Sequence, residues 1–210
     1  MSKVFGIGLS RTGTSSLNEA LELLGYRSIH FPIIMENTSP QAKLKYRLNK
    51  WGKELGKKQA FFTEFTSGTN NNLAFKKPDE SKFDAMTDLS VARFYKELDT
   101  AFSGSKFIFT IRDQDDWAQS CARFFAKGNH QFFKWQQVNI DMYGSNSFNE
   151  DLFRHAYQHH VRDVKTHFSQ RPQDLLIINI SAGEGWEKLC PFLGKSLLDF
   201  PFPKTNVASS

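Results

Sequence analysis

The chain of 210 residues has few cysteines and no long apolar run. Its cysteines, Cys121 and Cys190, are too few for a disulfide framework or a cysteine-based metal site, so we expect buried thiols in a reducing compartment. No stretch approaches the roughly 18 apolar residues of a membrane-spanning helix. The polar segment 6–16 interrupts the apolar start too early for a signal peptide. These absences predict a cytoplasmic protein without a transmembrane segment.

Charge of one sign does not dominate either, because 27 Lys and Arg residues face 22 Asp and Glu residues. The resulting net charge of +5 favours anionic partners such as phosphates or sulfates without choosing among them. No motif of a recognised nucleic-acid-binding module is present, so we expect no nucleic-acid partner. The length and the 40% hydrophobic content predict one domain over residues 1–210 with a buried core.

Strand and helix patterns alternate along the chain. Short apolar strands are expected at 3–8, 26–30, 83–87, 106–111 and 174–180, and helices at 14–24, 91–102, 115–126 and 186–193. The segment SFNE at 147–150 is typical of a capping box that opens a further helix to about Phe168. Strands separated by helices predict an α/β fold, a three-layer domain with a central parallel sheet. Residues that follow the strands should then meet at one edge of the sheet.

Two segments each allow two interpretations. Residues 43–58 carry seven basic side chains and one acid beside an apolar stripe, which fits a collar for an anion or, as we favour, a solvated helix face. Residues 66–82 are polar and are expected to form a loop, which is either a lid over the site or an insertion.

A glycine-rich loop, GLSRTGTS, occupies Gly8 to Ser15 between the first expected strand and helix. A phosphate-binding loop has the form G-x-x-x-x-G-K-[ST], and its lysine reaches the outer phosphates of a nucleotide. Here Thr14 stands in place of the lysine, and Arg11 lies inside the loop. Backbone N–H groups and the helix N-terminus can still hold an anion, with the Arg11 guanidinium as the cation.

The sequence resembles a known family at several places. SRTGTSSL at 10–17 resembles the 5′-phosphosulfate-binding loop of sulfotransferases that use 3′-phosphoadenosine-5′-phosphosulfate (PAPS). FIFTIRDQDDWAQS resembles their 3′-phosphate-binding element, with Arg112 and Ser120 in the matching places. GEGWEKLCPFLG and PFPKTN resemble the closing segment of small sulfotransferase-like proteins. The C-terminal arginine-lysine-glycine element of the cytosolic branch is missing.

This resemblance implies a P-loop NTPase-like sulfotransferase fold, with PAPS as the donor and adenosine 3′,5′-bisphosphate (PAP) as the product. It implies no metal. The donor-binding residues that it implies are Arg11, Thr12, Gly13, Thr14, Ser15, Ser16, Arg112 and Ser120. Trp186 is a weaker candidate for stacking on adenine.

The residue chemistry agrees with two anion sites separated by a ribose. Arg112 ends the apolar strand KFIFTI and can grip a phosphate with two parallel hydrogen bonds. The competing interpretation is that Arg112 pairs with Asp113, Asp115 or Asp116 on the surface.

Transfer to a hydroxyl also requires a general base. Asp88, after the strand KFDAMT, is the first candidate, although its position equally suits an N-cap of the next helix. His30, at the end of the second strand, is the second candidate, and packing or a turn contact is its other interpretation. Asp84 and Glu64 are remoter candidates.

We therefore expect a PAPS-dependent sulfotransferase with Asp88, Arg11 and His30 as catalytic residues. Its acceptor is expected to be a hydroxyl, less often an amine, of a small molecule or glycan. The alternatives are a nucleotide or small-molecule kinase that uses magnesium-ATP and a non-catalytic nucleotide-binding protein. The sequence leaves the acceptor and the oligomeric state open.

Overall fold

The computed structural model describes residues 2–37, 73–126 and 133–205. They fall into two compact units, Met1–Ile33 with Lys77–Ser210, and Ile34–Lys76. The single domain over residues 1–210 therefore stays a prediction. No helix in the described ranges is long and apolar enough to cross a membrane.

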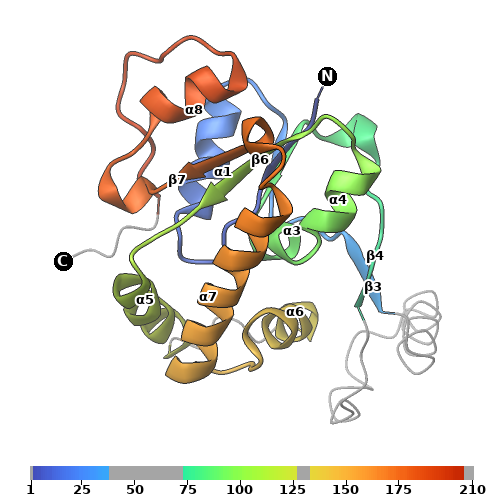
Figure 1. The fold of residues 1–210 in the computed structure, drawn as a ribbon, viewed down its shortest axis with the longest axis vertical. Coiled ribbons are helices and arrows are strands. Elements are labelled where there is room, and N and C mark those ends of the chain that lie inside the picture. Colours follow the sequence, from blue (N-terminus) through green and yellow to red (C-terminus); the bar gives the residue numbers. More distant parts are fainter. Residues whose placement is uncertain (1, 38–72, 127–132, 206–210) are drawn as a thin grey trace, which may run out of the picture. The chain divides into compact units, whose positions relative to one another are not determined.

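Five parallel strands form the central sheet of the first unit, in the order β2-β5-β1-β6-β7 (Figure 1). The strands are β1 (Val4–Gly6), β2 (Ser28–His30), β5 (Ala85–Thr87), β6 (Lys106–Thr110) and β7 (Leu175–Ile178). Each neighbouring pair is parallel. This confirms the predicted α/β fold with a central parallel sheet, and it places the carboxyl ends of all five strands along one edge.

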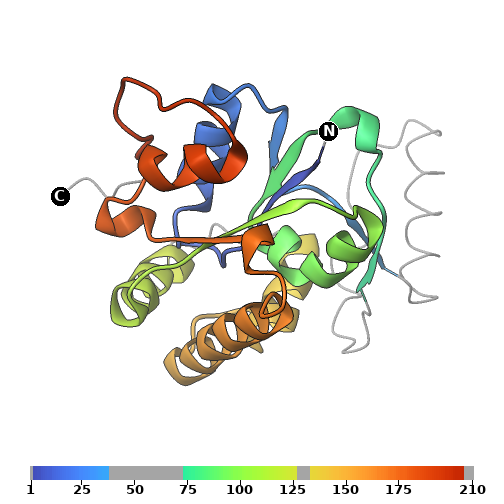
Figure 2. The same ribbon diagram turned by 45° about the horizontal axis from the view of Figure 1, so that its top comes forward.

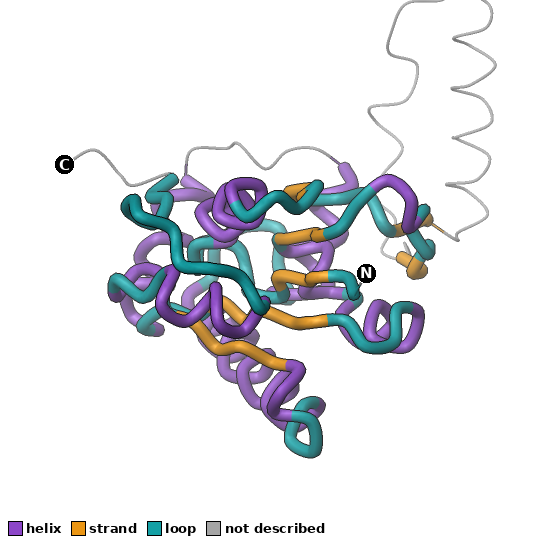
Figure 3. Tube along the Cα trace, turned by 90° about the horizontal axis from the view of Figure 1, so that it is seen from above, coloured by secondary structure: helices purple, strands orange, loops and turns teal. Residues whose placement is uncertain are grey.

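Helices cover both faces of this sheet, as the three-layer prediction requires (Figure 2). One face carries α1 (Thr14–Leu23) and α8 (Trp186–Leu193). The other carries α3 (Leu89–Arg93), α4 (Tyr95–Ala101) and α7 (Glu150–His167), with α5 (Gln114–Ala126) and α6 (Phe133–Tyr143) beside α7. Figure 3 shows the strands in a row between the helices.

The strands divide their side chains between these two layers. Val4 and Ile108 point into an apolar cluster with Leu17, Leu21 and Leu189 of α1 and α8. Their neighbours in sequence point the other way, because side chains alternate along a strand. Phe5 and Phe107 thereby join an aromatic cluster with Phe83, Phe102 and Phe168, whereas Phe109 packs against His160. The abundant phenylalanine is thus largely core.

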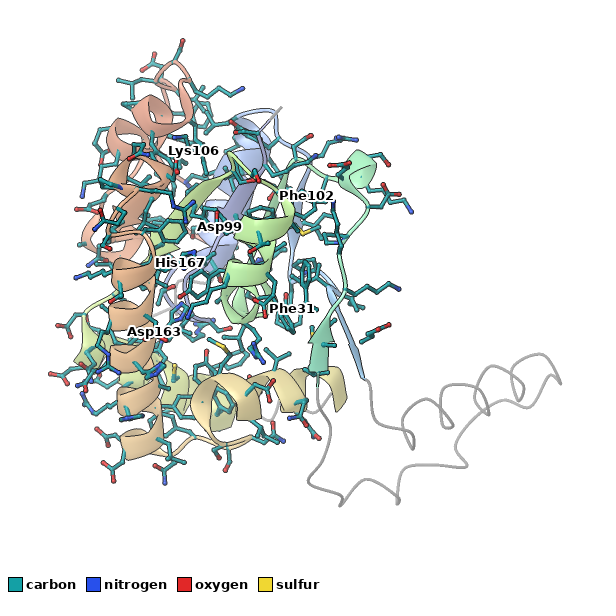
Figure 4. All side chains as sticks on the ribbon, turned by 45° about the vertical axis from the view of Figure 1, so that its right-hand side comes forward. Phe31, Asp99, Phe102, Lys106, Asp163 and His167 are labelled. Carbon is teal, nitrogen blue, oxygen red and sulfur yellow. The ribbon has the colours of Figure 1, made fainter. Side chains whose placement is uncertain are left out.

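An ion-pair cluster ties α4 to α7 on the aromatic side. Asp99 of α4 accepts a bidentate pair of hydrogen bonds from Arg171, at 3.0 and 2.6 Å. The same carboxylate lies 2.8 Å from Nε2 of His167 (Figure 4). The hydrogen bonds from the Arg171 guanidinium and then from His167 lower the pKa of Asp99 below its ordinary value. The cluster fixes the end of α7, whose other residues reach the site.

Several boundaries differ from the sequence prediction. The helix expected over 91–102 is divided at Phe94, whose φ of −115° and ψ of 23° separate α3 from α4. The capping box at 147–150 is wrong, because Asn149 rather than Ser147 accepts the Leu152 N–H at the start of α7. Ser147 instead pairs with Ser145.

The second unit contains a strand pair that the sequence reading missed. β3 (Met35–Asn37) pairs antiparallel with β4 (Leu73–Phe75). The loop predicted over 66–82 is therefore wrong for β4, and residues 80–82 form a short 3-10 helix in the first unit. Residues 43–58 lie outside the described ranges.

Candidate donor and transfer site

The carboxyl edge of the sheet gathers the four segments that the sequence singled out. The glycine loop follows β1, His30 ends β2, Asp88 follows β5 and Arg112 lies two residues after β6. In the described part of the chain, the non-glycine residues with positive φ are Arg11 (72°), Phe31 (56°) and Asp88 (90°). Each lies in a segment that follows one of these strands. Such strained backbone concentrates at functional sites, because surrounding contacts must hold it in place.

Close backbone approach explains the first glycine of the loop. A Cβ at Gly8 would lie 1.9 Å from Thr110 Oγ1 and 2.6 Å from the Thr110 carbonyl oxygen. The Thr110 hydroxyl is used there, since it lies 2.6 Å from the hydroxyl of Thr12. Thr12 also donates to the Leu9 carbonyl at 2.7 Å. The side chain of Thr12 therefore braces the loop from inside.

The N-terminus of α1 is open to an anion. Gly13, with φ of 100°, precedes the helix and provides no side-chain cap. The first turn contains no acidic residue. The first backbone N–H groups of a helix have no partner within the helix, and their positive dipole end favours negative charge. Trp117 holds the preceding turn by donating from Nε1 to the Ser10 carbonyl at 2.9 Å.

Arg11 connects the two predicted donor-binding elements. Its Nε lies 3.3 Å from Ser120 Oγ on α5, and its guanidinium lies 5.2 Å from the centre of the Phe124 ring. Ser120 is buried. The structure thus brings the loop after β1 and the helix after β6 into direct contact, as the sequence predicted for one donor site.

Arg112 is held through its backbone and leaves its side chain uncommitted. Tyr157 of α7 accepts from the Arg112 N–H at 3.2 Å and donates to the Arg112 carbonyl. In the described residues, the buried Nε of Arg112 has no hydrogen-bond partner. A buried donor without a partner costs about 1–3 kcal/mol, and none of the described residues supplies an acceptor for this one.

Two of the three aspartates offered as surface partners of Arg112, Asp113 and Asp115, are engaged elsewhere. Asp113 accepts the backbone N–H groups of Asp115 and Asp116, at 2.9 and 3.1 Å, and so caps α5. Asp115 pairs with Arg154 at 2.6 Å. Across the described ranges, Arg112 forms no ion pair with any of these three carboxylates.

The pKa of the buried Cys121 thiol depends on two of the charged groups of this site. Burial raises the pKa of this thiol to about 12, while the nearby guanidinium groups of Arg11 and Arg112 act in the opposite direction. Both cations therefore lie close to the same buried thiol. Cys121 is 1% exposed and serves as packing beneath the two arginines.

The two base candidates lie side by side. Nε2 of His30 is 3.4 Å from Oδ2 of Asp88, and the two side chains are 34% and 13% exposed. The other carboxylate oxygen of Asp88 accepts from Ser10 at 3.0 Å and from Thr14 at 3.2 Å. Asp88 stands at the N-cap of α3 but makes no side-chain cap hydrogen bond. Its carboxylate faces the glycine loop instead.

His30 has contacts on both ring nitrogens. Nε2 lies 3.2 Å from Ser15 Oγ at the start of α1. Nδ1 lies 2.9 Å from the hydroxyl of Thr87, the last residue of β5. Side chains of α1, of β5 and at the N-cap of α3 therefore orient the His30 ring beside the glycine loop.

Other residues proposed from the sequence lie apart from this centre. Asp84 precedes β5 at the opposite edge, where it accepts a bidentate pair of hydrogen bonds from Arg27. Trp186 is 7% exposed and packs on Phe202, so it belongs to the core. The side chain of Ser16 is buried and accepts from the Thr205 N–H at 3.0 Å, although its backbone N–H belongs to the first turn of α1 beside the site. Glu64 lies outside the described residues.

The sequence reading missed the residues that support the site. Ser10 and Thr87 orient Asp88 and His30, and Tyr157 and Trp117 fix the backbone beside Arg112 and Ser10. Ser10 and Thr87 directly flank predicted site elements, so their position was a usable signal. Tyr157 carried none, because it lies 45 residues from Arg112 within an ordinary amphipathic helix.

The fold is a P-loop-like α/β fold, with the glycine loop, Arg112 and the His30–Asp88 pair at the carboxyl edge of its sheet. The sequence model of the family described as "Sulfotransferase domain" matches residues 3–210. The chain therefore belongs to the sulfotransferase family.

Two relatives extend this comparison. "Ava biosynthesis cluster protein M" of Aspergillus versicolor is 27% identical over 222 residues, which cover 96% of this chain and 78% of that protein. The crystal structure of a sulfotransferase from Alicyclobacillus acidocaldarius is similar with a TM-score of 0.52 and 16% identity. That similarity covers 100% of this chain and 87% of the other, and it shows a shared fold.

Proposed function

We propose that the protein transfers a sulfuryl group from PAPS to a hydroxyl group, less often to an amine. The observation that carries this proposal is the buried Nε of Arg112, which has no hydrogen-bond partner among the described residues. Arg112 and Arg11 both act on the pKa of the Cys121 thiol, and Arg11 contacts Ser120. A 3′-phosphate on the donor would give Arg112 an acceptor that the described residues do not supply. The open N-terminus of α1 would hold the 5′-phosphosulfate.

The site residues divide the work of an in-line displacement. By analogy with phosphoryl transfer, positioning and charge stabilisation carry most of the catalysis. Arg11 and the N–H groups at the start of α1 would stabilise the oxygens of the transferred group and of the leaving phosphate. The bond from sulfur to the phosphate oxygen breaks, that oxygen leaves with PAP, and a new bond forms between sulfur and the acceptor oxygen. No step needs a metal ion.

The proton of the acceptor passes to the His30–Asp88 pair. Both groups lie beside Ser15 and Thr14, at the loop where the sulfonate would sit. His30 is the base in this proposal, because Asp88 already accepts two hydroxyl hydrogen bonds. Asp88 would stabilise the positive ring that forms. We propose a small-molecule or glycan acceptor and a cytoplasmic location, as the sequence suggested.

Ligand-induced thermal stabilisation tests the donor. PAP at about 100 times its dissociation constant stabilises a fold by about 2.7 kcal/mol. For a domain of this size the midpoint should rise by roughly 5 to 10 °C. Arg112→Ala should abolish the rise, because the 3′-phosphate loses its partner. Arg123→Ala is the matched control, since Arg123 is an exposed arginine on α5, the helix that follows Arg112.

The outcomes separate the possible functions. A rise with PAP that survives in Arg123→Ala and disappears in Arg112→Ala supports the PAPS site. A rise only with magnesium-ATP would contradict it and favour a kinase. Binding of PAP without transfer to any hydroxyl or amine in an acceptor screen would favour a non-catalytic nucleotide-binding protein.

A further inference from the structure

A hydrogen-bond chain behind His30 runs from the ring into α1. It consists of Thr87, Asn18 and Glu22, with Ser28 as a side branch. Thr87 is fully buried at the end of β5. None of these side chains touches the expected position of the transferred group, so their effect on the reaction passes through His30.

The direction of each hydrogen bond follows from the far end of this chain. Glu22 carries a carboxylate, which only accepts, so the Asn18 amide nitrogen donates to it at 2.9 Å. The Asn18 amide oxygen therefore faces the other way, and it accepts from Ser28 at 2.7 Å and from Thr87 at 3.3 Å. The amide orientation is thus determined by its partners.

The single proton of the Thr87 hydroxyl is then committed to Asn18. Its oxygen faces Nδ1 of His30 at 2.9 Å and can only accept there. A neutral imidazole carries one proton, and a hydrogen bond at one nitrogen decides which nitrogen holds it. With the Thr87 proton directed to Asn18, a neutral ring would carry its proton on Nδ1 and keep the lone pair on Nε2.

We infer that Thr87, oriented by Asn18, is a positioning residue that holds neutral His30 as its Nδ1–H tautomer and so makes Nε2 the atom that takes the acceptor's proton. This rests on the proposed function. In the transfer step the acceptor O–H bond breaks, its proton binds Nε2, and the acceptor oxygen bonds sulfur as the sulfur–oxygen bond to PAP breaks. The charged ring is then 3.4 Å from Asp88.

The opposite tautomer would place the site in the wrong state. With a proton on Nε2, the ring would donate toward Asp88 or Ser15 and could not accept a proton from a substrate at that atom. The Asp88 carboxylate by itself would favour this arrangement, because it accepts hydrogen bonds. The contact of Thr87 with Nδ1 opposes this Nε2–H tautomer.

Nitrogen-15 NMR of the imidazole rings in the full-length, ligand-free protein measures the tautomer directly. The chain has 6 histidines, and His30→Gln identifies the His30 signals. We expect the neutral ring to show a protonated Nδ1 and an unprotonated Nε2. Thr87→Val keeps the shape but removes the hydroxyl, and it should lower the ratio of Nδ1–H to Nε2–H by about 2- to 10-fold, the range expected for one hydrogen bond.

Three further variants separate orientation from general damage to the fold. Thr87→Ser should retain the wild-type ratio, because it retains the hydroxyl. Ser105→Ala removes another buried hydroxyl and should leave the ratio unchanged, since Ser105 precedes β6 and donates to the Phe102 carbonyl, away from the site. Asn18→Ala frees the Thr87 proton to face the ring and should lower the ratio, and it replaces Thr87→Val if that variant does not fold.

An Nε2–H tautomer in the wild-type protein, or a ratio that Thr87→Val and Asn18→Ala both leave unchanged, would overturn the inference. These measurements need no donor or acceptor. A failure here is therefore distinct from a failure of the proposed function, which the PAP measurement reports.

Discussion

Single residues at the carboxyl edge carry unusual constraints. Arg11 and Asp88 adopt positive φ without being glycine, and Gly8 stands where no side chain fits. The reason is local crowding, because the loop after β1 packs directly on the end of β6 through Thr12 and Thr110. At this scale the proposed anion site depends on how closely the backbone of one strand end can approach the next.

Gly8→Ala should therefore destroy donor binding. The added methyl group would lie 1.9 Å from the Thr110 hydroxyl oxygen, so the loop must move away from β6. Overpacking of this kind costs about 1–3 kcal/mol of stability. We expect a lower thermal midpoint and no stabilisation by PAP.

Gly104→Ala is the matched control for this change. Gly104 has φ of 76° and nothing within 4 Å of an added Cβ, so only backbone strain is introduced. It should lose stability yet keep the rise with PAP. A Gly8→Ala protein that still responds to PAP would show that the loop tolerates displacement.

The residue at which a helix begins determines where its side chains lie along the site, and α7 is an example. Helix α7 begins with Asn149, which accepts the Leu152 N–H at 3.0 Å, and it has Glu150 and Asp151 in its first turn. From there the helix carries Tyr157 to Arg112 and His160 to the carbonyl of Ile7. A capped start therefore supports two contacts beneath the site.

Asn149→Ala should cost about 1 kcal/mol of unfolding free energy, the usual value of an N-cap. Urea denaturation measures it. Ser147→Ala is the control, because Ser147 lies outside the helix and its hydroxyl contacts only Ser145 among the described residues, so its cost should stay below about 0.5 kcal/mol. Equal costs for the two variants would contradict the assignment of Asn149 as the cap.

At the scale of the whole first unit, one buried histidine joins α7 to the sheet beneath the loop. His160 is 6% exposed, and its Nε2 lies 2.8 Å from the carbonyl oxygen of Ile7, directly before Gly8. Tyr95 and Phe109 pack edge-on against its ring. Burial lowers the pKa of His160 below its ordinary value, so the folded protein holds the ring neutral.

This pKa makes global stability depend on pH. Because the folded pKa is depressed, the unfolded chain binds a proton first as the pH falls. The stability is therefore complete above the unfolded pKa of about 6.5 and declines below it, by at most about 1.4 kcal/mol per pH unit. Asp163 opposes this shift, whereas His159 and Lys96 reinforce it.

His160→Gln isolates the effect, since a glutamine amide can donate to Ile7 without titrating. Urea unfolding at pH of about 7.5 and about 5.5 should show a larger loss of free energy in the wild type than in His160→Gln. An equal loss in both proteins would assign the pH dependence to other groups.

Much of the fold could be predicted from the sequence. Most strands and helices of the sheet unit follow local apolar patterns, although α6 was not predicted, and the parallel arrangement follows from their alternation. The division of the 91–102 helix at Phe94 and the strand β4 could not be predicted from the sequence. In both places, contacts with distant parts of the chain outweigh the local sequence pattern. Four successive residues from Leu89 to Ala92 are buried, and β4 is defined by its pairing with β3.

The sequence by itself determined the parts of the site: a glycine loop with Arg11, an apolar strand that ends before Arg112, and polar residues at two other strand ends. Only the tertiary structure decided which of them meet. Arg11 reaches Ser120 across 109 residues of sequence, and Asp88 turns to His30 instead of capping its own helix. The physical reason is that strand order and side-chain direction depend on packing across the whole sheet, which no local pattern encodes.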